Sequence, residues 1–260
     1  MTNIEEFINK LQFKKSHQFV ILTNPSEEDV IRAGRTISHH ILICGKRPWK
    51  TPLELLGWKQ WQTIWQKEDE WHYINQNYLP TSYLDLWGMY NYEEFYERIA
   101  NWLRPYSTIV EIGTFWGRSI VHLSTMLKQL NKKASIYAID PYNEWTPGSI
   151  PCNVPTYQMN IRNFKHIGVE DVNLIPMLSA HAARHFSDDS IDFVYVDGNH
   201  TQEAVQCDLT LYYPKVRRGG IIAGHDYTDA YPGVKEAVDA KFGFENIKTY
   251  KNGVWEYYKS

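Results

Sequence analysis

One glycine-containing stretch, residues 109–119, limits the possible folds of this chain more than any other part of the sequence. Residues 108–112 form a mostly apolar, β-branched run that is typical of a central parallel strand. Gly113 permits a sharp turn after this strand, and Gly117 permits close approach of another group to the first turn of a helix. Apolar residues then recur at helical spacing, at Ile120, Val121, Leu123, Leu127 and Leu130. The stretch therefore predicts a strand, a tight turn and a helix whose N-terminus faces a crevice.

The spacing within this turn indicates which ligand it binds. A dinucleotide fingerprint needs a glycine two residues after the first one, and Phe115 occupies that position here. Glu111 would repel a phosphate, whereas a carboxylate suits a ligand that carries an ammonium or a sulfonium. The pattern E-x-G-x-x-x-G resembles the first motif of class I S-adenosylmethionine-dependent methyltransferases, although a turn in another α/β protein stays open. The resemblance implies that the cofactor contacts Glu111, Gly113, Thr114, Gly117 and Ser119.

Composition restricts the partners and the compartment. The chain has 260 residues, a net charge of -3 and no dominant Lys/Arg run, which disfavours nucleic acid as a main partner. Three widely spaced cysteines form neither a metal spacing nor a disulfide framework, as expected for a protein of the reducing cytoplasm. No apolar stretch is long enough to span a membrane, and the N-terminal sequence does not resemble a signal peptide. We therefore predict a cytoplasmic protein that acts on a small molecule, without a membrane partner.

Residues 1–90 differ from the rest and are predicted to form an N-terminal extension to a domain over residues 91–260. The apolar run Phe19–Leu22 predicts a short strand, and Ile41–Cys44 predicts either a strand or the continuation of a helix. Thr51–Glu54 resembles a capping box and predicts a helix that carries three tryptophans, Trp58, Trp61 and Trp65.

The aromatic residues between positions 56 and 96 leave two interpretations open. Trp and Tyr bury large areas, so these side chains could fasten the extension to the main domain or to a second subunit of a homo-oligomer. Alternatively, some of them form an acceptor pocket, because aromatic faces pack well on sugars and aromatic ligands.

After the glycine turn, strands and helices alternate regularly. Strands are predicted over residues 134–140, 172–176, 191–197 and 221–227, with helices between them and a turn at Arg217–Gly220. Asn252-Gly253 indicates a hairpin between two closing strands, predicted over Phe244–Tyr250 and Val254–Tyr258. The fold class is therefore α/β: a Rossmann-like, doubly wound, mostly parallel seven-stranded sheet with an antiparallel C-terminal strand.

Polar residues follow several of these strands. Asp140 ends the second strand of the domain, where a carboxylate can accept hydrogen bonds from both ribose hydroxyls, although an acidic turn residue is the alternative. Tyr142 would flank the cofactor or belong to the core, and segment 143–155 forms a loop over the same edge. Ser179 is a candidate cofactor contact and the cap of a helix predicted over Ala180–Phe186. His181 and His185 have a metal-binding spacing but no third ligand nearby, so solvated or packed histidines are favoured.

The second half adds a more specific resemblance. The glycine motif, Asp140, the segment Asp197–His200 and the segment Arg218–Tyr227 follow one another as in metal-dependent macrolide-sugar O-methyltransferases. The similarity runs from about residue 91 to the C-terminus. It implies a divalent cation, Mg²⁺ or Mn²⁺, at Asp197, His225 and Asp226, and His200 as the general base.

This sequence departs from that family at one ligand. A carboxylate usually occupies the position of His225, and nitrogen suits Mg²⁺ poorly, so Mn²⁺ or two protein ligands with waters become the alternatives. A metal-free site also stays open, with Asp197 as a cofactor-site carboxylate and residues 225–226 as a turn. For His200, the alternative is a structural histidine that bonds Asp226 or the backbone.

The combined expectation is a cytoplasmic S-adenosylmethionine-dependent O-methyltransferase. Its acceptor would be a hydroxyl of a small polyhydroxy metabolite, a sugar or a glycosylated natural product. Two other functions stay open, namely a tailoring or regulatory protein that binds the cofactor without transferring methyl, and a hydroxylase-like relative on the same scaffold.

Overall fold

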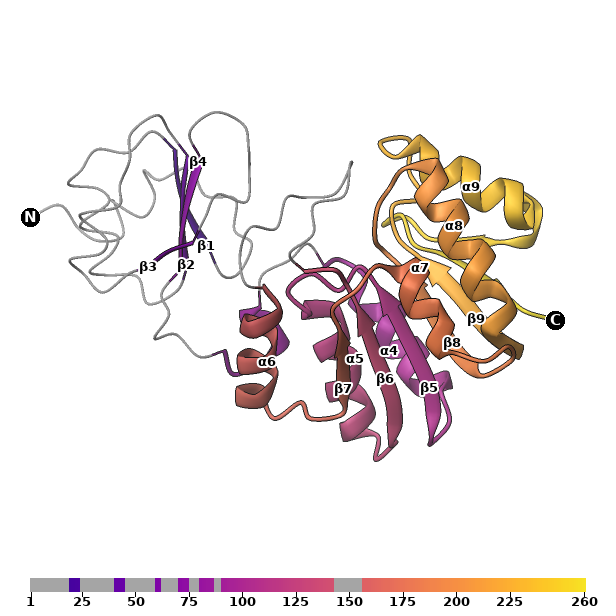
Figure 1. The fold of residues 1–260 in the computed structure, drawn as a ribbon, viewed down its shortest axis with the longest axis horizontal. Coiled ribbons are helices and arrows are strands. Elements are labelled where there is room, and N and C mark those ends of the chain that lie inside the picture. Colours follow the sequence, from indigo (N-terminus) through magenta and orange to yellow (C-terminus); the bar gives the residue numbers. More distant parts are fainter. Residues whose placement is uncertain are drawn as a thin grey trace, which may run out of the picture.

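The fold is taken from a computed structural model of the chain (Figure 1). It describes residues 19–23, 40–44, 59–61, 70–74, 80–86, 90–142 and 156–260. The predicted helix start at Thr51–Glu54 and the predicted loop 143–155 lie outside the described residues.

Within the described part of the first 74 residues, four short strands form a small sheet of their own. Their bounds are β1 Phe19–Thr23, β2 His40–Cys44, β3 Lys59–Trp61 and β4 Glu70–Ile74, and their order is β1-β2-β4-β3. The strand at Phe19–Leu22 is confirmed, and Ile41–Cys44 is a strand rather than a helix. The prediction that Trp61 lies on a helix is wrong, because it pairs with His72 of the neighbouring strand β4.

The main sheet has seven strands in the order β10-β11-β9-β8-β5-β6-β7. Strands β9, β8, β5, β6 and β7 pair in parallel, and β11 runs antiparallel to both β9 and β10. This confirms the predicted mostly parallel sheet with an antiparallel C-terminal strand. The bounds are β5 Ser107–Ile112, β6 Ala134–Ile139, β7 Val172–Ile175, β8 Ile191–Val196, β9 Val216–Gly224, β10 Lys248–Thr249 and β11 Trp255–Tyr258.

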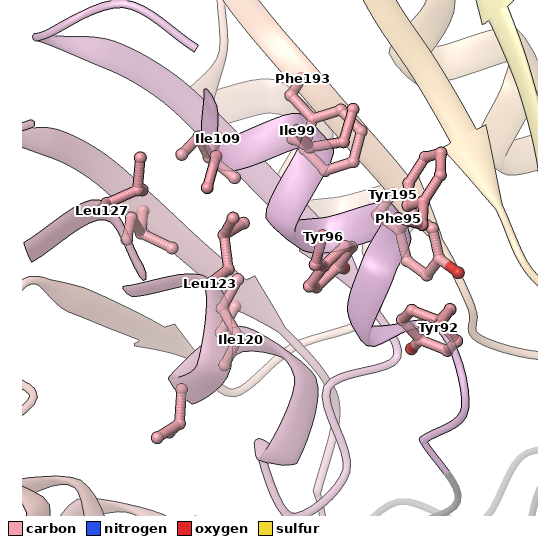
Figure 2. Packing of buried hydrophobic residues seen from close by; sticks show 14 of the residues in the cluster. Tyr92, Phe95, Tyr96, Ile99, Ile109, Ile120, Leu123, Leu127, Phe193 and Tyr195 are labelled. Atoms are coloured by element: carbon pink, nitrogen blue, oxygen red, sulfur yellow. The ribbon is translucent and has the colours of Figure 1, made fainter. Parts of the chain in front are cut away.

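Helices cover both faces of this sheet, which makes it doubly wound (Figure 1). Alternate residues of β8 divide between the faces: Phe193 and Tyr195 pack with α4 and α5, whereas Val194 and Val196 pack with α8 and α9. Figure 2 shows the first face, where Phe95, Tyr96 and Ile99 of α4 lie against β8. The bounds are α4 Glu93–Trp102, α5 Arg118–Gln129, α6 Thr156–Ile167, α7 Ser179–Ala182, α8 Gln202–Tyr212 and α9 Pro232–Phe242.

Two predictions near the C-terminus are wrong. Residues 217–220 lie within β9 instead of forming a turn. The register between β8 and β9 shifts at these residues, as in a β-bulge, and Arg217 Nε donates to Asp192 Oδ1 at 2.6 Å. Residues 244–246 form a 3₁₀ turn, which shortens the predicted first strand of the hairpin to Lys248–Thr249.

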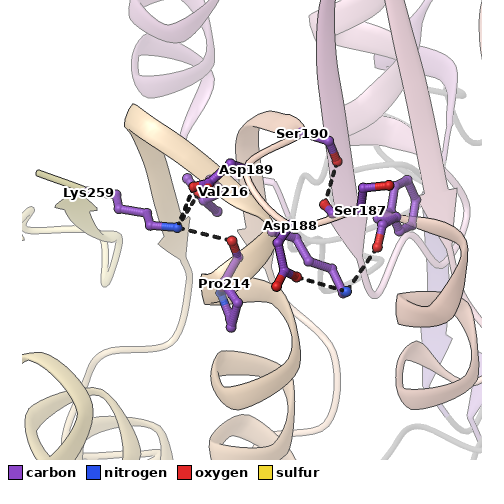
Figure 3. Close-up of polar contacts among 9 residues, drawn as sticks. Ser187, Asp188, Asp189, Ser190, Pro214, Val216 and Lys259 are labelled. Carbon is purple, nitrogen blue, oxygen red and sulfur yellow. Dashed lines mark hydrogen bonds and ion pairs between the residues drawn. The ribbon is translucent and has the colours of Figure 1, made fainter.

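Lys259, the residue after β11, holds the beginning of β9 in place (Figure 3). Lys259 Nζ donates to the carbonyls of Pro214 and Val216 and to the carboxylate of Asp189, at 2.6–3.0 Å. The backbone of Lys259 also pairs with Gly219 and Gly220. The segment predicted as a turn is therefore held within β9 by hydrogen bonds to the C-terminal residues.

In the described parts of the chain, no helix has the length and apolarity that crossing a membrane requires.

Candidate active site

Both glycines of the motif are required by close contacts with neighbouring elements. Gly113 has φ +86°, and a Cβ there would lie 1.9 Å from the carbonyl oxygen of Asp197, just beyond β8. Gly117 has φ +76° at the N-cap of α5, and a Cβ there would lie 2.2 Å from the ring of Phe164 on α6. The prediction that Gly117 permits close approach is confirmed, and the approaching group is this ring.

Glu111 ends β5 as a buried carboxyl group, with only 1% of the residue exposed. Tyr96 Oη of α4 donates to one oxygen at 2.6 Å, and Ser119 Oγ of α5 donates to the other at 2.8 Å. Burial raises the pKa of Glu111 to about 8, although these two hydrogen bonds oppose the shift. The two carboxyl oxygens of Glu111 therefore link β5 to α4 and α5. A cofactor group that hydrogen-bonds Glu111 would share these oxygens with Tyr96 and Ser119.

We expect Glu111→Gln to remove a pH-dependent contribution to stability. Because the folded-state pKa lies above the ordinary 4.5, the native protein binds more protons than the unfolded chain between pH 4.5 and about 8. The contribution of Glu111 is therefore fully present below pH 4.5 and is lost as the pH rises to about 8. The slope is on the order of 1 kcal/mol per pH unit.

Thermal unfolding between pH 5 and 9 measures this effect. The Tm of Glu111→Gln relative to wild type should rise with pH, because glutamine is neutral throughout. Glu170→Gln, at an exposed position, is the matched control and should follow the wild-type profile. Parallel Tm profiles for wild type and Glu111→Gln would contradict the raised pKa.

Asp140 follows β6, and its carboxylate links the glycine turn to Tyr142 through hydrogen bonds. Its Oδ2 accepts the backbone N–H of Phe115 at 2.8 Å, and its Oδ1 accepts that of Tyr142 at 2.7 Å. Burial raises the pKa of Asp140, and the two N–H donors partly oppose this. Each carboxylate oxygen retains a second lone pair, so the predicted bonds to ribose hydroxyls are still possible. Tyr142 is 1% exposed and is a core residue, with its ring centroid 5.4 Å from that of Tyr157.

Two further predicted cofactor contacts, Thr114 and Ser179, make hydrogen bonds to other residues of the domain. Thr114 is buried, and its carbonyl accepts the N–H of Gly117 at 2.8 Å, which closes the turn. The predicted cap at Ser179 is wrong: Leu178 is the N-cap of α7, and Ser179 Oγ donates to the buried Asp208 at 2.5 Å. The helix predicted over 180–186 is a short α7 followed by a 3₁₀ turn, on which both histidines are exposed.

The chemistry-bearing residues of the second half meet where β8 and β9 end. Since these strands are parallel neighbours, Asp197, His200, His225 and Asp226 reach the same edge of the sheet. Asp226, at φ +59°, lies between the two imidazoles: its Oδ2 is 2.9 Å from His200 Nε2 and its Oδ1 is 3.2 Å from His225 Nδ1. Donor atoms of Asp197, His225 and Asp226 lie within 4.8 Å of one another. We call these three residues the carboxylate–imidazole group.

The charges of this site compensate one another. Burial raises the pKa of Asp197 to about 6, with a further increase from Asp226 and a decrease from the two histidines. Burial also acts to raise the pKa of Asp226, but the hydrogen bonds from His200 and His225 outweigh it and hold that pKa well below the usual range. Burial by itself lowers the pKa of either histidine, yet their bonds to Asp226 and the nearby carboxylates give a net increase.

The sequence analysis missed two residues that precede α4 and contact this site. Tyr92 Oη donates to Asp197 Oδ2 at 2.9 Å, and the Tyr92 ring lies 4.9 Å from that of His225. Asn91 Oδ1 lies 3.1 Å from His225 Nε2. The only sequence signal was the high aromatic content around Tyr92, which does not reveal a contact 105 residues away.

The aromatic residues that the structure describes before α4 also fasten this segment to the domain. Tyr83 stacks on His122 of α5 with ring centroids 4.2 Å apart, and Tyr90 Oη lies 2.5 Å from His122 Nδ1. For these residues the fastening interpretation is correct, whereas Tyr92 combines packing with a contact in the site.

Comparison with known proteins agrees with this fold. Residues 110–227 match the family described as "Methyltransferase domain", a span that includes both the glycine turn and Asp226. The O-methyltransferase NovP has a similar fold, with a TM-score of 0.51 and 19% identity over 65% of this chain and 79% of that chain. A putative caffeoyl-CoA O-methyltransferase from Staphylococcus aureus has a TM-score of 0.50 and 13% identity, over 67% and 86% of the chains.

Among curated proteins, the uncharacterized protein R132 of Acanthamoeba polyphaga mimivirus is 28% identical over 168 residues, 57% of this chain and 70% of that protein. Residues 110–227 therefore carry a methyltransferase domain, and the strand order and the glycine turn are those of the class I S-adenosylmethionine-dependent methyltransferase fold.

Proposed function

We propose that this methyltransferase acts on oxygen, at a hydroxyl of a small polyhydroxy metabolite, a sugar or a glycosylated natural product. In this proposal His200 is the general base, and a divalent cation at the carboxylate–imidazole group orients the acceptor. The observation that carries the proposal is the position of Asp226, which contacts His200 through one oxygen and His225 through the other.

The Asp226–His200 pair suits a base that removes a hydroxyl proton. When His200 is neutral and donates Nε2–H to Asp226 Oδ2, its Nδ1 carries the lone pair. The carboxylate then fixes the tautomer and stabilises the imidazolium that forms when Nδ1 takes a proton. Tyr231, whose ring centroid lies 4.5 Å from that of His200, supports the imidazole from a second side.

The donor set fits a divalent cation with some nitrogen affinity. Two carboxylates and one imidazole suit Mn²⁺ better than Mg²⁺, because hard Mg²⁺ prefers oxygen ligands. Asp226 can use Oδ1 toward a cation and keep Oδ2 on His200, so the two roles do not compete for one atom. A cation at this position would hold the acceptor hydroxyl beside the base and favour its deprotonated form.

The residues present also fit the cofactor. Asp140 offers carboxylate oxygens at the edge of the sheet for the ribose. Burial raises the pKa values of Glu111, Asp140 and Asp197, and a bound sulfonium would favour their ionised forms. S-adenosylmethionine supplies the electrophilic methyl group, while the protein positions the acceptor oxygen in line and removes its proton. We further propose that residues 1–90 act as a lid, an acceptor pocket or an oligomerisation element.

A methyl-transfer assay with labelled S-adenosylmethionine tests the acceptor class. Sugars, glycosides and polyols should accept the label, and the same compounds with the reactive hydroxyl already methylated should not. Calorimetry should show binding of S-adenosylhomocysteine but not of NAD. Label that enters nitrogen or carbon of a test acceptor, or tight NAD binding, would contradict the proposal.

Exhaustive chelation should abolish methyl transfer, and Mn²⁺ should restore it more effectively than Mg²⁺. Asp197→Ala should have the same effect as chelation because it removes a carboxylate ligand, while affinity for S-adenosylhomocysteine should change little. Initial rates across a metal titration measure this. Full activity in the chelated protein would exclude the cation and leave only the acid–base part of the proposal.

A further inference from the structure

We infer that Asn91 is a positioning residue, which selects the ring nitrogen that His225 offers to the divalent cation. The inference rests on the proposed cation at the carboxylate–imidazole group. It assigns a role to a segment that precedes the residues matched by the methyltransferase family, 110–227.

The two nitrogens of His225 have different neighbours. Nδ1 lies 3.2 Å from Asp226 Oδ1, on the side of the carboxylate–imidazole group, and Nε2 lies 3.1 Å from Asn91 Oδ1. A neutral imidazole carries one proton, so it can donate to only one of these oxygens. If Nε2–H donates to the amide oxygen of Asn91, Nδ1 keeps its lone pair and can bind a cation together with Asp197 and Asp226.

Asn91 is itself held by a distant part of the chain. Asn252 Nδ2, from the turn between β10 and β11, donates to the backbone carbonyl oxygen of Asn91 at 2.9 Å. The adjacent Tyr92 donates its hydroxyl to Asp197 and packs its ring 4.9 Å from the His225 ring, at an interplanar angle of 40°. The backbone of Asn91 is therefore held from the β10–β11 turn, and the His225 ring packs on Tyr92.

This arrangement follows a general pattern of metal sites. A histidine ligand usually donates its second N–H to a carboxylate or carbonyl oxygen, which fixes the tautomer, and loss of that partner lowers metal affinity about 10–100-fold. An amide oxygen provides the acceptor without adding a charge. With a neutral asparagine, the two carboxylates of Asp197 and Asp226 balance the two positive charges of the cation.

Mn²⁺ binding, followed by electron paramagnetic resonance, tests the inference without any turnover. Asn91→Leu removes the acceptor at similar size and should weaken Mn²⁺ binding about 10–100-fold. Asn91→Asp keeps an oxygen acceptor and should retain near wild-type affinity or bind more tightly. Asn101→Leu, an exposed position on α4, is the matched control and should bind Mn²⁺ as wild type does. Affinity for S-adenosylhomocysteine, measured on every variant, reports whether the fold is intact.

Nitrogen-detected NMR of His225 with Zn²⁺ as a diamagnetic probe reports the tautomer directly. Wild type should show a protonated Nε2 and a metal-bound Nδ1, and His225→Gln assigns the signal. If Asn91→Leu binds Mn²⁺ like wild type while Asp197→Ala does not, the cation site stands and the role of Asn91 is wrong. If wild type binds no Mn²⁺, both the cation and the role of Asn91 are wrong, and the general-base proposal for His200 is then tested separately by its own variants.

Discussion

Replacing His200 with glutamine should lower kcat about 10²–10⁴-fold, because a positioned general base contributes a factor of that size. A hydroxyl group is too weakly acidic to lose its proton unaided at neutral pH. Glutamine can still donate a hydrogen bond to Asp226, which in the wild type lies 2.9 Å from His200 Nε2, but it cannot accept the proton. His200→Gln should therefore be nearly as slow as His200→Ala, while affinity for S-adenosylmethionine stays close to that of wild type.

Chemical rescue separates a base from a structural histidine. Added imidazole should restore part of the activity of His200→Ala, since it can occupy the vacated space and accept the proton, and it should not restore His200→Gln. His185→Gln, at an exposed position, is the matched control and should keep the wild-type rate. Rates must be measured in single turnovers, so that chemistry and not product release is observed. Wild-type turnover in His200→Gln under these conditions would make His200 structural.

Replacing Gly113 with alanine should destabilise the protein by more than about 4 kcal/mol, in the range reserved for severe core defects. Two effects add. A non-glycine residue at φ +86° carries backbone strain, and its Cβ would lie 1.9 Å from the Asp197 carbonyl oxygen. Relief would require β5 and β8 to separate, although they pair directly from Ile109 to Ile112. Because Asp197 follows β8, cofactor and cation binding should be lost together with stability.

Gly168→Ala is the matched control for this experiment. Gly168 has φ +83°, almost the same backbone conformation, but nothing lies within 4 Å of the Cβ that alanine would add. Gly168→Ala should therefore lower the free energy of unfolding by the backbone strain alone, about 1–2 kcal/mol. Chemical denaturation of both variants, with calorimetry of S-adenosylhomocysteine binding, measures the difference. Equal losses of stability in the two variants would show that the contact with Asp197 is unimportant.

Sequence periodicity was sufficient to predict the main sheet, because each strand–turn–helix unit is determined by residues close together in the sequence. The β-branched run before Gly113, the apolar spacing of α5 and the Asn252-Gly253 turn each limit the backbone through neighbours only a few residues away. Parallel strands must then place their carboxyl ends at one edge, so the convergence of Asp197 with Asp226 could also be predicted.

Local patterns were insufficient where strand pairing overrides them. Residues 217–220 have a turn composition, yet pairing with the C-terminal residues and the bond from Arg217 to Asp192 keep them within β9. Trp61 fits a helical spacing, yet it pairs with His72 in a sheet. In both cases the deciding hydrogen bonds come from residues distant in sequence, which propensity does not include.

By itself, the sequence determined the fold class, the glycine turn and the strand ends that carry Asp140, Asp197, His200 and Asp226, because these depend on local backbone geometry and on the rule that parallel strands share an edge. Only the tertiary structure decided how those side chains are held. Glu111 accepts hydrogen bonds from Tyr96 and Ser119, and Asp226 lies between the imidazoles of two histidines. Asn91 contacts His225, which is 134 residues away in the sequence. Such contacts depend on which distant surfaces pack together, and no spacing within one segment specifies them.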